Sequence, residues 1–444
     1  MNIQITHEFE RIFKLFDAGQ NVAILGSAGV GKSVAINLLR RRGQAAGKTV
    51  AVLAPTGIAA RNVNGQTINS YFGLPSYLSS SHTLNDIEER IAKQLMNTDI
   101  LIFDEESMKT ALTFDNISDI AKYARCNGKP FGGMQVVIVG DPFQIPPVVN
   151  ERNGDRKLLL DTCGYNSVFF FASRVYSELA FNHVELTHVF RQSDKAFIGV
   201  LNRLRKYQVT KEDLNYLNKR AQSEPPQNAL ILGTTNKVVD RHNILSLDSN
   251  RNPSAFYNAT SGGNFNESDC PASYQLFVKE GVRVMIVANF TDDNGVKAVN
   301  GDVGIIKSLY DDIIDVELDS GYSIAVTPFL WEKYGREINP DGKTWENTRT
   351  GFCTQFPIKV AAASTVHKAQ GLSLPAVHID LSSSFFCAGQ AYTSLSRVRS
   401  YEGLTLSRKL GIYELMKFAP RGINGRANEA KILMDWYQRI DLNK

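Results

Sequence analysis

A glycine-rich loop between an apolar run and a helical pattern constrains this chain most. The loop reads G-x-x-x-x-G-K-S and consists of Gly26, Ser27, Ala28, Gly29, Val30, Gly31, Lys32 and Ser33. The run at 22–25 predicts a buried strand, and the stretch at 34–39 predicts a helix. This context distinguishes a phosphate-binding loop from a glycine turn without chemical consequence. Backbone N–H groups in the loop and the positive end of the helix both attract anions, so we predict a nucleotide site.

A pair of acids follows a second apolar strand pattern. The run at 99–103 ends in Asp104 and Glu105. Acids at the carboxyl end of a parallel strand face the same crevice as a phosphate loop. We expect Lys32 to reach the β- and γ-phosphates, and Ser33 and Asp104 to hold Mg²⁺. Glu105 would orient and deprotonate an attacking water, which favours hydrolysis over transfer; the alternative is an acidic helix start.

Size and composition indicate a globular protein. The 444 residues suffice for two or three domains, and 43% hydrophobic and 21% charged residues are ordinary values. The net charge of +4 predicts that any nucleic-acid surface is a local groove. The five cysteines are scattered without a CxxC pair, and the seven histidines lack metal-ligand spacing. A disulfide framework or zinc site is therefore not expected, and a reducing compartment fits.

Targeting signals are not recognised in the sequence. No apolar run reaches membrane-spanning length, and the first eight residues lack the basic-then-apolar form of a signal peptide. The phosphate loop begins so early that a transit peptide is not expected. We therefore expect a cytoplasmic protein, with a bacterial or viral origin favoured over an organelle.

The chain alternates strands and helices at both ends. Apolar runs at 22–25, 50–54, 99–103 and 136–140, separated by helical patterns, predict a parallel sheet with crossover helices. A second α/β region begins near 185 and includes a strand at 229–233. The stretch 251–273 reads as loop, and the short alternating runs from 282 to 326 predict a small β-barrel with a hairpin turn at 319–321. The α/β pattern returns near 357, and a terminal helix is expected at 428–440.

Three further side chains complete a candidate ATPase site. Gln144 follows the fourth apolar run, and its amide would sense the γ-phosphate from a loop stiffened by prolines. Arg397 and Arg191 are candidates for an arginine that stabilises charge on the γ-phosphate from another domain. The alternative for each arginine is a surface ion pair.

The ordered set of motifs resembles the superfamily 1B helicases, and within them the Pif family of 5′→3′ DNA helicases. The segment PFGG at 130–133 resembles the stretch that marks the Pif family among its relatives. The other matching segments are GSAGVGKS at 26, APTGIAA at 54, DEESM at 104, GDPFQIPPV at 140, LTHVFRQ at 186, TTNKVVDRHN at 234, NGDVG at 300, STVHKAQGLSL at 364 and AYTSLSRVRSYEGL at 391.

This resemblance implies a fold and a division into domains. It implies two RecA-like parallel-sheet domains, with ATP and Mg²⁺ in the cleft between them, and a small SH3-like β-barrel inserted in the second. The first domain would span 1–185, with a small excursion at about 62–96. The second would span 186–245 and 356–444, and the insertion 246–355.

The resemblance also implies a function and a set of DNA contacts. It implies an ATP-dependent 5′→3′ DNA helicase that moves along single-stranded DNA and unwinds duplex at single-strand/duplex junctions. We expect the motor to be a monomer. G-quadruplexes and RNA–DNA hybrids are further implied targets, and DNA repair, recombination and telomere maintenance are the family's roles. The DNA-binding residues would be Pro55, Thr56, Thr67, Asn69, Thr235, Asn236, His367 and Lys368. Tyr71 and Phe72 would either stack on bases or lie in the core.

The sequence departs from the family pattern at four positions. Phe9 stands where a glutamine usually reads adenine, with Gln4 as a substitute, and Asn69 stands where a histidine is usual. Glu106 replaces an apolar residue, and Pro142 replaces an aromatic one. None of these changes removes a hydrolytic residue. Two other functions stay open: a translocase that displaces proteins with little unwinding, and a nucleotide-switched DNA-binding module without motor activity.

Overall fold

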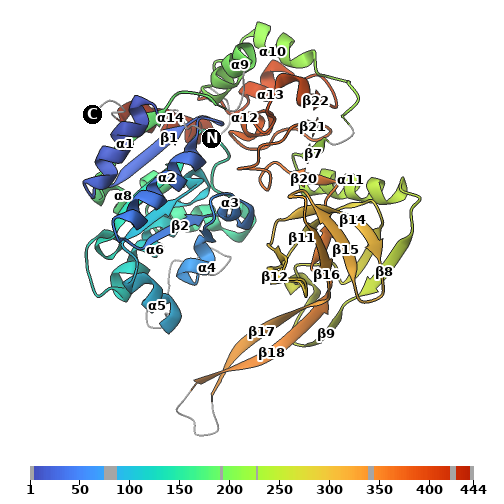
Figure 1. Ribbon diagram of the computed structural model, residues 1–444. Coiled ribbons are helices and arrows are strands. Elements are labelled where there is room, and N and C mark those ends of the chain that lie inside the picture. The colour runs from blue at the N-terminus through green and yellow to red at the C-terminus, as the bar shows by residue number, and fades with distance from the viewer. Residues whose placement is uncertain are drawn as a thin grey trace. The chain divides into compact units, whose positions relative to one another are not determined.

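The computed structural model describes residues 5–74, 88–190, 194–226, 229–338, 345–420 and 427–440. The chain forms two compact units, Met1–Thr234 with Thr365–Lys444, and Thr235–Ser364 (Figure 1). Residues 75–87, which belong to the excursion expected at about 62–96, lie outside the described residues. The boundaries between three domains stay a prediction.

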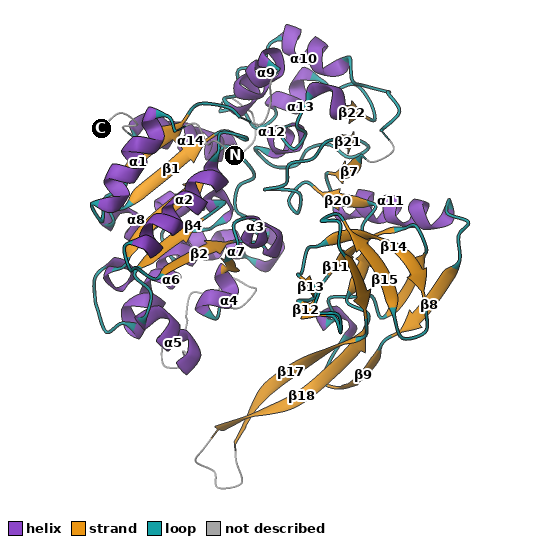
Figure 2. Cartoon of the chain, in the orientation of Figure 1, coloured by secondary structure: helices purple, strands orange, loops and turns teal. Residues whose placement is uncertain are grey.

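The first unit contains a six-stranded sheet in the order β3-β2-β4-β5-β1-β6. Neighbouring strands of this sheet run parallel to each other, as the alternation of apolar runs and helical patterns predicted. The strands are β1 (Val22–Gly26), β2 (Val50–Ala54), β3 (Gln66–Thr67), β4 (Ile100–Phe103), β5 (Gln135–Gly140) and β6 (Asn182–Leu186). The helices along this part of the chain are α1 (His7–Asp17), α2 (Lys32–Ala45), α3 (Gly57–Asn62), α4 (Ile68–Phe72), α5 (Glu89–Met96), α6 (Ala111–Ala124), α7 (Asp155–Lys157) and α8 (Arg174–Glu178) (Figure 2).

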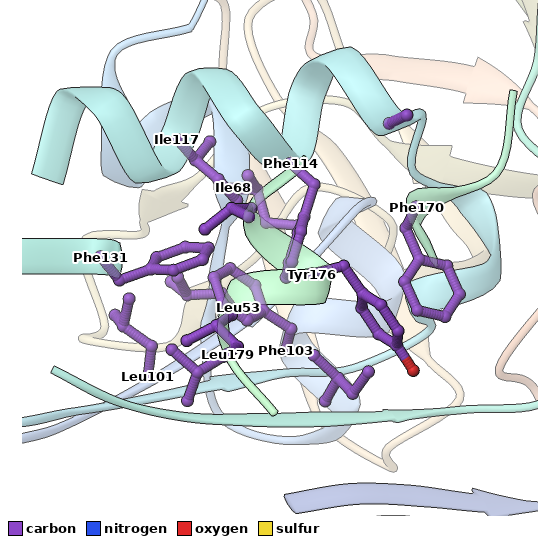
Figure 3. Close-up of a cluster of buried hydrophobic side chains, with 14 of the residues drawn as sticks. Leu53, Ile68, Leu101, Phe103, Phe114, Ile117, Phe131, Phe170, Tyr176 and Leu179 are labelled. Carbon is purple, nitrogen blue, oxygen red and sulfur yellow. The ribbon is translucent and has the colours of Figure 1, made fainter. Parts of the chain in front are cut away.

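Alternate residues of each strand enter different cores, because successive side chains of a strand point to opposite faces. On one face, strand residues such as Ile24 and Ile102 pack against α1 and α2. On the other face, Leu25 and Phe103 pack with residues of α4, α5, α6 and α8. Figure 3 shows part of the second core, where Phe103 lies among aromatic and aliphatic side chains. Burial on both faces explains why these strands read as continuous apolar runs.

A second parallel sheet in the same unit has β21 (Val377–Asp380) between β7 (Leu230–Gly233) and β22 (Leu404–Leu406). The nearby helices are α9 (Lys195–Arg205), α10 (Lys211–Asn218), α12 (Gln390–Leu395) and α13 (Ile412–Met416). The expected terminal helix is α14 (Ala427–Arg439). Its Trp436 ring stacks on the Phe171 ring, with 4.4 Å between the ring centres, in the core of the first sheet. The two-sheet α/β architecture predicted from the sequence is therefore confirmed.

The second unit begins with α11 (Asn236–Asp248) and is otherwise rich in antiparallel strands. A five-stranded sheet runs in the order β16-β15-β14-β11-β19, and a three-stranded sheet runs in the order β17-β18-β9. The strands are β8 (Ser254–Asn258), β9 (Thr260–Gly263), β10 (Gln275–Lys279), β11 (Arg283–Ile286), β12 (Phe290–Thr291), β13 (Lys297–Ala298), β14 (Val303–Leu309), β15 (Ile314–Leu318), β16 (Ser323–Val326), β17 (Phe329–Ile338), β18 (Trp345–Gln355) and β19 (Ile358–Val360). β20 (Ala363–Thr365) marks the return to the first unit.

The β-rich insertion and its hairpin are confirmed, but one local expectation is wrong. The predicted turn at 319–321 joins β15 and β16, with Gly321 at a φ of +86°. The stretch 251–273 was expected to be loop, yet it contains β8 and β9. β9 is polar and largely exposed, and it pairs with the distant β18. β8 carries Phe256 and Tyr257 and forms by pairing with the nearby β10. Within the described residues the five-stranded sheet has two different edge strands, so closure into an SH3-like barrel stays a prediction.

Candidate nucleotide site

A cavity of about 670 Å³ in the first unit brings the phosphate loop together with residues from both parallel sheets. From the first sheet it is lined by Lys32, Ser33, Asp104, Glu105 and Gln144, each of which follows the carboxyl end of a strand. From the region of the second sheet it is lined by Gly371, Ser373, Arg397 and Arg399. This is the edge at which ligands bind in open α/β sheets.

The phosphate loop joins β1 to α2 through left-handed glycines. Gly29 and Gly31 have φ values of +83° and +90°, a region that side chains rarely adopt. The Nζ of Lys32 donates hydrogen bonds to the carbonyl oxygens of Gly26 and Ser27, each at 2.8 Å. Burial lowers the pKa of Lys32, while Asp141 and Glu105 oppose this shift. The Lys32 ammonium group thus lies against its own loop at the start of α2, where a bound phosphate would compete with the two carbonyl oxygens for its hydrogen bonds.

The acid pair lies directly after β4. Asp104 and Glu105 are both buried, and the Glu105 backbone has a left-handed φ of +50°. Burial and the neighbouring Glu105 raise the pKa of Asp104 to about 7. The backbone N–H of Glu105 donates to the Asp104 carboxylate at 2.9 Å. Two carboxyl groups are therefore held together at the cavity wall, in positions that a cation would stabilise.

The donor set fits Mg²⁺. The hydroxyl of Ser33 and the carboxylate of Asp104 line one cavity and are oxygen ligands of the kind Mg²⁺ prefers. Among the described residues no group of three or more His, Cys, Asp or Glu side chains forms a metal cage. A site completed by phosphate and water oxygens agrees with both observations, because Mg²⁺ is usually held by one or two carboxylates plus phosphates.

Two glutamines lie beside the acids. Gln144 is 3% exposed and lines the cavity, and its Oε1 has no hydrogen-bond partner among the described residues. Gln370 is also buried, and its Nε2 donates to Glu105 Oε2 at 2.9 Å. Sequence reasoning placed Gln370 in a loop at the cleft but assigned it no role. Its position between Lys368 and Gly371, in a segment that matches the helicase motifs, was the available signal.

Arg397, one of the two candidate arginines, lines this cavity. It is 1% exposed, and its guanidinium donates to the Thr393 carbonyl at 2.9 Å and the Ser396 hydroxyl at 2.9 Å. Burial lowers the pKa of Arg397, and Glu105 is the first of the groups that oppose this shift. Arg399, which sequence reasoning missed, also lines the cavity. The other candidate, Arg191, lies outside the described residues.

Two phenyl rings flank the phosphate loop. A side chain at Gly31 would come within 3.6 Å of both Phe9 and Phe190, and these rings line the cavity. Phe9 is buried in α1, whereas Phe190 is 46% exposed. This part of the cavity therefore offers apolar contact of the kind that suits a nucleobase. Gln4, the substitute considered for reading adenine, lies outside the described residues.

A buried polar network connects the two sheets behind the phosphate loop. The N–H of Ala28 donates to the Tyr392 hydroxyl at 2.9 Å, and that hydroxyl donates to Asp141 Oδ2 at 2.8 Å. Arg205 in α9 donates through Nε to Asp141 Oδ1 at 2.9 Å and through Nη1 to Glu185 at 3.1 Å. Sequence reasoning missed this network, because its members come from five separate segments.

Two candidate DNA contacts in the first sheet cap short helices. Thr56 precedes α3 and accepts a hydrogen bond from the Ala59 N–H at 3.2 Å, and Thr67 precedes α4 and accepts from the Ser70 N–H at 3.3 Å. Pro55 is half-buried, beside Thr56, and Asn69 is exposed on α4. Their role in DNA binding stays a prediction.

The remaining candidates lie in other segments. His367 is half-buried and stacks on Phe386 at 5.7 Å, and Lys368 beside it is exposed. Thr235 and Asn236 lie at the start of α11 in the second unit. Tyr71 and Phe72, considered as base-stacking residues, are only 4% and 2% exposed, which favours the alternative that they are core residues.

Comparisons with known proteins agree with this architecture. The family model of PIF1-like helicases matches residues 4–213. The ATP-dependent DNA helicase PIF1 of Emericella nidulans is 28% identical over 92% of this chain, and the chain spans only 60% of that relative's length. None of the helices in the described part of this chain has the length and apolarity to cross a membrane.

Solved structures match nearly the whole chain. A crystal structure of Bacteroides Pif1 bound to single-stranded DNA has a TM-score of 0.84 and 32% identity, covering 98% of this chain and 97% of that one. A structure of Bacteroides Pif1 with ADP-AlF3 and single-stranded DNA has a TM-score of 0.83, with the same identity and coverage. With this identity over nearly the full length of both chains, the protein belongs to the PIF1-like helicase family.

Proposed function

We propose that this protein is an ATP-dependent DNA helicase that moves 5′→3′ along single-stranded DNA and unwinds duplex. The observation that carries this proposal is the shared cavity, in which Lys32 and Glu105 meet Arg397 from the region of the second sheet. Hydrolysis at such a site would be sensitive to any change in the spacing of the two sheets. A motor requires that sensitivity.

Each lining residue has a distinct task in hydrolysis. Lys32 and the loop N–H groups bind the β- and γ-phosphates, and Glu105 orients the attacking water and accepts its proton. Arg397 and Gln144 contact the γ-phosphate, and the arginine stabilises the charge that develops on it. Ser33 and Asp104 would hold Mg²⁺, which when bound neutralises phosphate charge.

The buried network supplies a path from chemistry to motion. Tyr392 and Arg205 belong to helices beside the second sheet, and they meet the first sheet at Ala28 and Asp141. Loss of the γ-phosphate would release Arg397 from the nucleotide and let the two sheets separate. Opening one base-pair step costs about 1.4 kcal/mol on average, which is small beside the free energy of ATP hydrolysis.

The track is proposed to be single-stranded DNA. Bacteroides Pif1, which shares the fold and 32% of its residues, has been solved bound to single-stranded DNA. Threonine hydroxyls, helix N-terminal N–H groups and Lys368 are suited to phosphate oxygens, so binding should weaken with salt. We extend the proposal to single-strand/duplex junctions, to G-quadruplexes and RNA–DNA hybrids as further targets, and to a monomeric motor.

The domain division follows the same proposal. We assign 1–185 and the segments 186–245 and 356–444 to two RecA-like domains, and 246–355 to the insertion. The cavity then lies at the junction of the two RecA-like domains, where the family places ATP.

DNA-stimulated ATP hydrolysis tests the proposal. The wild-type protein should hydrolyse ATP faster when single-stranded DNA is added, and Lys32→Ala should abolish that turnover. Turnover by the lysine variant at the wild-type rate would refute the assigned site. Wild-type hydrolysis that ignores DNA would instead favour a nucleotide-switched binding module.

A further inference from the structure

The buried amide of Gln370 contacts the carboxylate proposed to activate water. Its Nε2 donates to Glu105 Oε2 at 2.9 Å, and the two residues are 3% and 7% exposed. We propose that Gln370 is a positioning residue, which holds the Glu105 carboxylate for hydrolysis and ties it to the segment that carries His367 and Lys368. This inference rests on the proposed function.

Glu105 needs support from outside its own strand. Its backbone is left-handed at a φ of +50°, a conformation that non-glycine residues adopt only when their surroundings impose it. Its carboxylate lies next to the buried Asp104, a like charge. The Gln370 amide is the side-chain hydrogen-bond donor recorded for this carboxylate among the described residues. Gln370 therefore holds one oxygen of the Glu105 carboxylate in place.

An amide suits this task better than a cation. A lysine or arginine would neutralise the carboxylate and weaken it as a base, whereas a neutral N–H fixes one oxygen and leaves the charge in place. The other end of the amide, Gln370 Oε1, is buried without a hydrogen-bond partner among the described residues. A buried acceptor without a donor is rare in native proteins. A water beside Glu105 would supply that donor, giving one hydrogen to the carboxylate and one to the amide.

The backbone around Gln370 links this contact to two other parts of the site. The Gln370 backbone N–H donates to the His367 carbonyl at 3.3 Å. This hydrogen bond fixes the proposed DNA contact His367 relative to the residue that donates to Glu105. Gly371 follows at a φ of +82°, and a side chain there would lie 3.5 Å from Glu105 Oε1. The next carbonyl, that of Leu372, accepts a hydrogen bond from Arg397 at 3.3 Å.

The six residues 367–372 thus carry a candidate DNA contact, the hydrogen-bond donor to Glu105 and a hydrogen-bond acceptor for Arg397. A DNA phosphate bound at His367 or Lys368 would fix the segment and, through Gln370, the Glu105 carboxylate. DNA would then accelerate hydrolysis by ordering the Glu105 carboxylate rather than by changing how tightly ATP binds.

The test uses variants that keep the volume of Gln370 but remove its N–H donor. Gln370→Met and Gln370→Leu fill similar space without adding a charge beside Glu105, so a packing role predicts near-normal rates for both. We expect both variants to lower the DNA-stimulated kcat at least tenfold, with the KM for ATP and the affinity for single-stranded DNA changed less than threefold. The DNA-independent rate should fall by a smaller factor, so that stimulation by DNA is reduced.

A matched control is Gln135→Met, because Gln135 is an amide of the same unit whose Nε2 donates to the carbonyls of Phe16 and Gln20. It should leave kcat unchanged. Binding of a fluorescent ATP analogue shows that each variant is folded. Stimulated rates within threefold of wild type, or equal losses with and without DNA, would overturn the inference. A wild-type protein that lacks DNA-stimulated turnover would overturn the proposed function instead.

Discussion

The hydroxyl of Tyr392 lies 2.9 Å from the backbone nitrogen of Ala28, so α12 contacts the phosphate loop directly. The same hydroxyl donates to Asp141, which also accepts from Arg205. A single phenol oxygen therefore joins the loop that would bind ATP to a helix beside the second sheet.

Replacing Tyr392 with phenylalanine should loosen the contact between the two sheets. The variant keeps the buried ring but leaves the Ala28 N–H and one Asp141 oxygen without this partner. Leaving a buried polar group unpaired costs about 1–3 kcal/mol, so the free energy of unfolding should fall by about that amount. Chemical denaturation measures this change. Tyr401→Phe is the control, since the Tyr401 hydroxyl donates to the Tyr216 carbonyl away from the phosphate loop. ATP affinity should fall in Tyr392→Phe only; equal ATP affinity in both variants would contradict the link.

Replacing Arg397 with alanine should remove turnover but not nucleotide binding. An arginine that contacts the γ-phosphate contributes about 10³–10⁵ in kcat in related phosphoryl-transfer sites. We expect kcat to fall at least a hundredfold with little change in ATP affinity, as measured by steady-state hydrolysis and by equilibrium binding. Arg408→Ala is the control, because Arg408 pairs with Glu414 at 2.7 Å and does not line the cavity. Normal turnover by Arg397→Ala would remove this residue from the chemistry.

The ion pair between Lys109 and Glu106 should be replaceable by an apolar pair. The Lys109 Nζ lies 2.6 Å from Glu106 Oε2 and 4.3 Å from the centre of the Phe103 ring, and both side chains are at most 3% exposed. Burial raises the pKa of Glu106 and lowers the pKa of Lys109. Removing one partner of a buried pair costs about 3–5 kcal/mol, whereas replacing both is often neutral or stabilising.

We therefore expect Lys109→Met alone to lower the free energy of unfolding by about 3–5 kcal/mol. The double variant Glu106→Ile, Lys109→Met should recover most of that loss, because no charge is left buried. Denaturant midpoints of the two single variants and the double variant form the test. A double variant that is no more stable than Lys109→Met would show that the pair itself stabilises the fold.

His183 should make the fold less stable as the pH falls below about 6.5. Burial lowers the pKa of His183 below its ordinary value, and its Nε2 lies 2.7 Å from the Tyr176 hydroxyl. The unfolded chain takes up a proton near pH 6.5, but the folded chain does so only at lower pH. In that interval the unfolded state binds more protons, so stability falls with decreasing pH by up to about 1.4 kcal/mol per pH unit.

Thermal unfolding between pH 7.5 and 5.5 measures this effect. His183→Gln retains a hydrogen-bonding group without the titration, so its Tm should fall less steeply than that of the wild type. Because other histidines affect both proteins alike, the difference between the two curves isolates His183. Parallel curves would contradict the assignment.

Local sequence patterns were sufficient to predict four of the six strands of the first sheet and the clustering of candidate residues at their carboxyl ends. The apolar runs before Gly26 and Asp104 predicted buried strands, and strand ends in a parallel sheet meet at one edge, so the residues after them gather in one cavity. The same reasoning failed for β8 and β9. β8 is short and lies among turn-forming residues, and it forms by pairing with β10. β9 is polar and gives no periodic signal, and pairing with the distant β18 determines its conformation.

The residues whose roles were missed share a physical cause. Gln370, Arg399 and Tyr392 act through contacts with segments far along the sequence, and neither composition nor spacing reveals such contacts. Arg397 was identified from its motif, but its hydrogen bonds to Thr393 and Ser396 depend on how α12 ends. Glu106 was recognised as a departure from the family pattern, whereas its pairing with Lys109 emerges only once the short 3-10 helix Glu106–Met108 turns the chain after β4.

The most direct test of the central claim is unwinding of two matched duplexes, one with a 5′ single-stranded tail and one with a 3′ tail. The wild-type protein should separate only the 5′-tailed duplex, in a reaction that requires ATP and is lost in Lys32→Ala. Separation of the 3′-tailed duplex alone, or unwinding that persists in Lys32→Ala, would contradict the account.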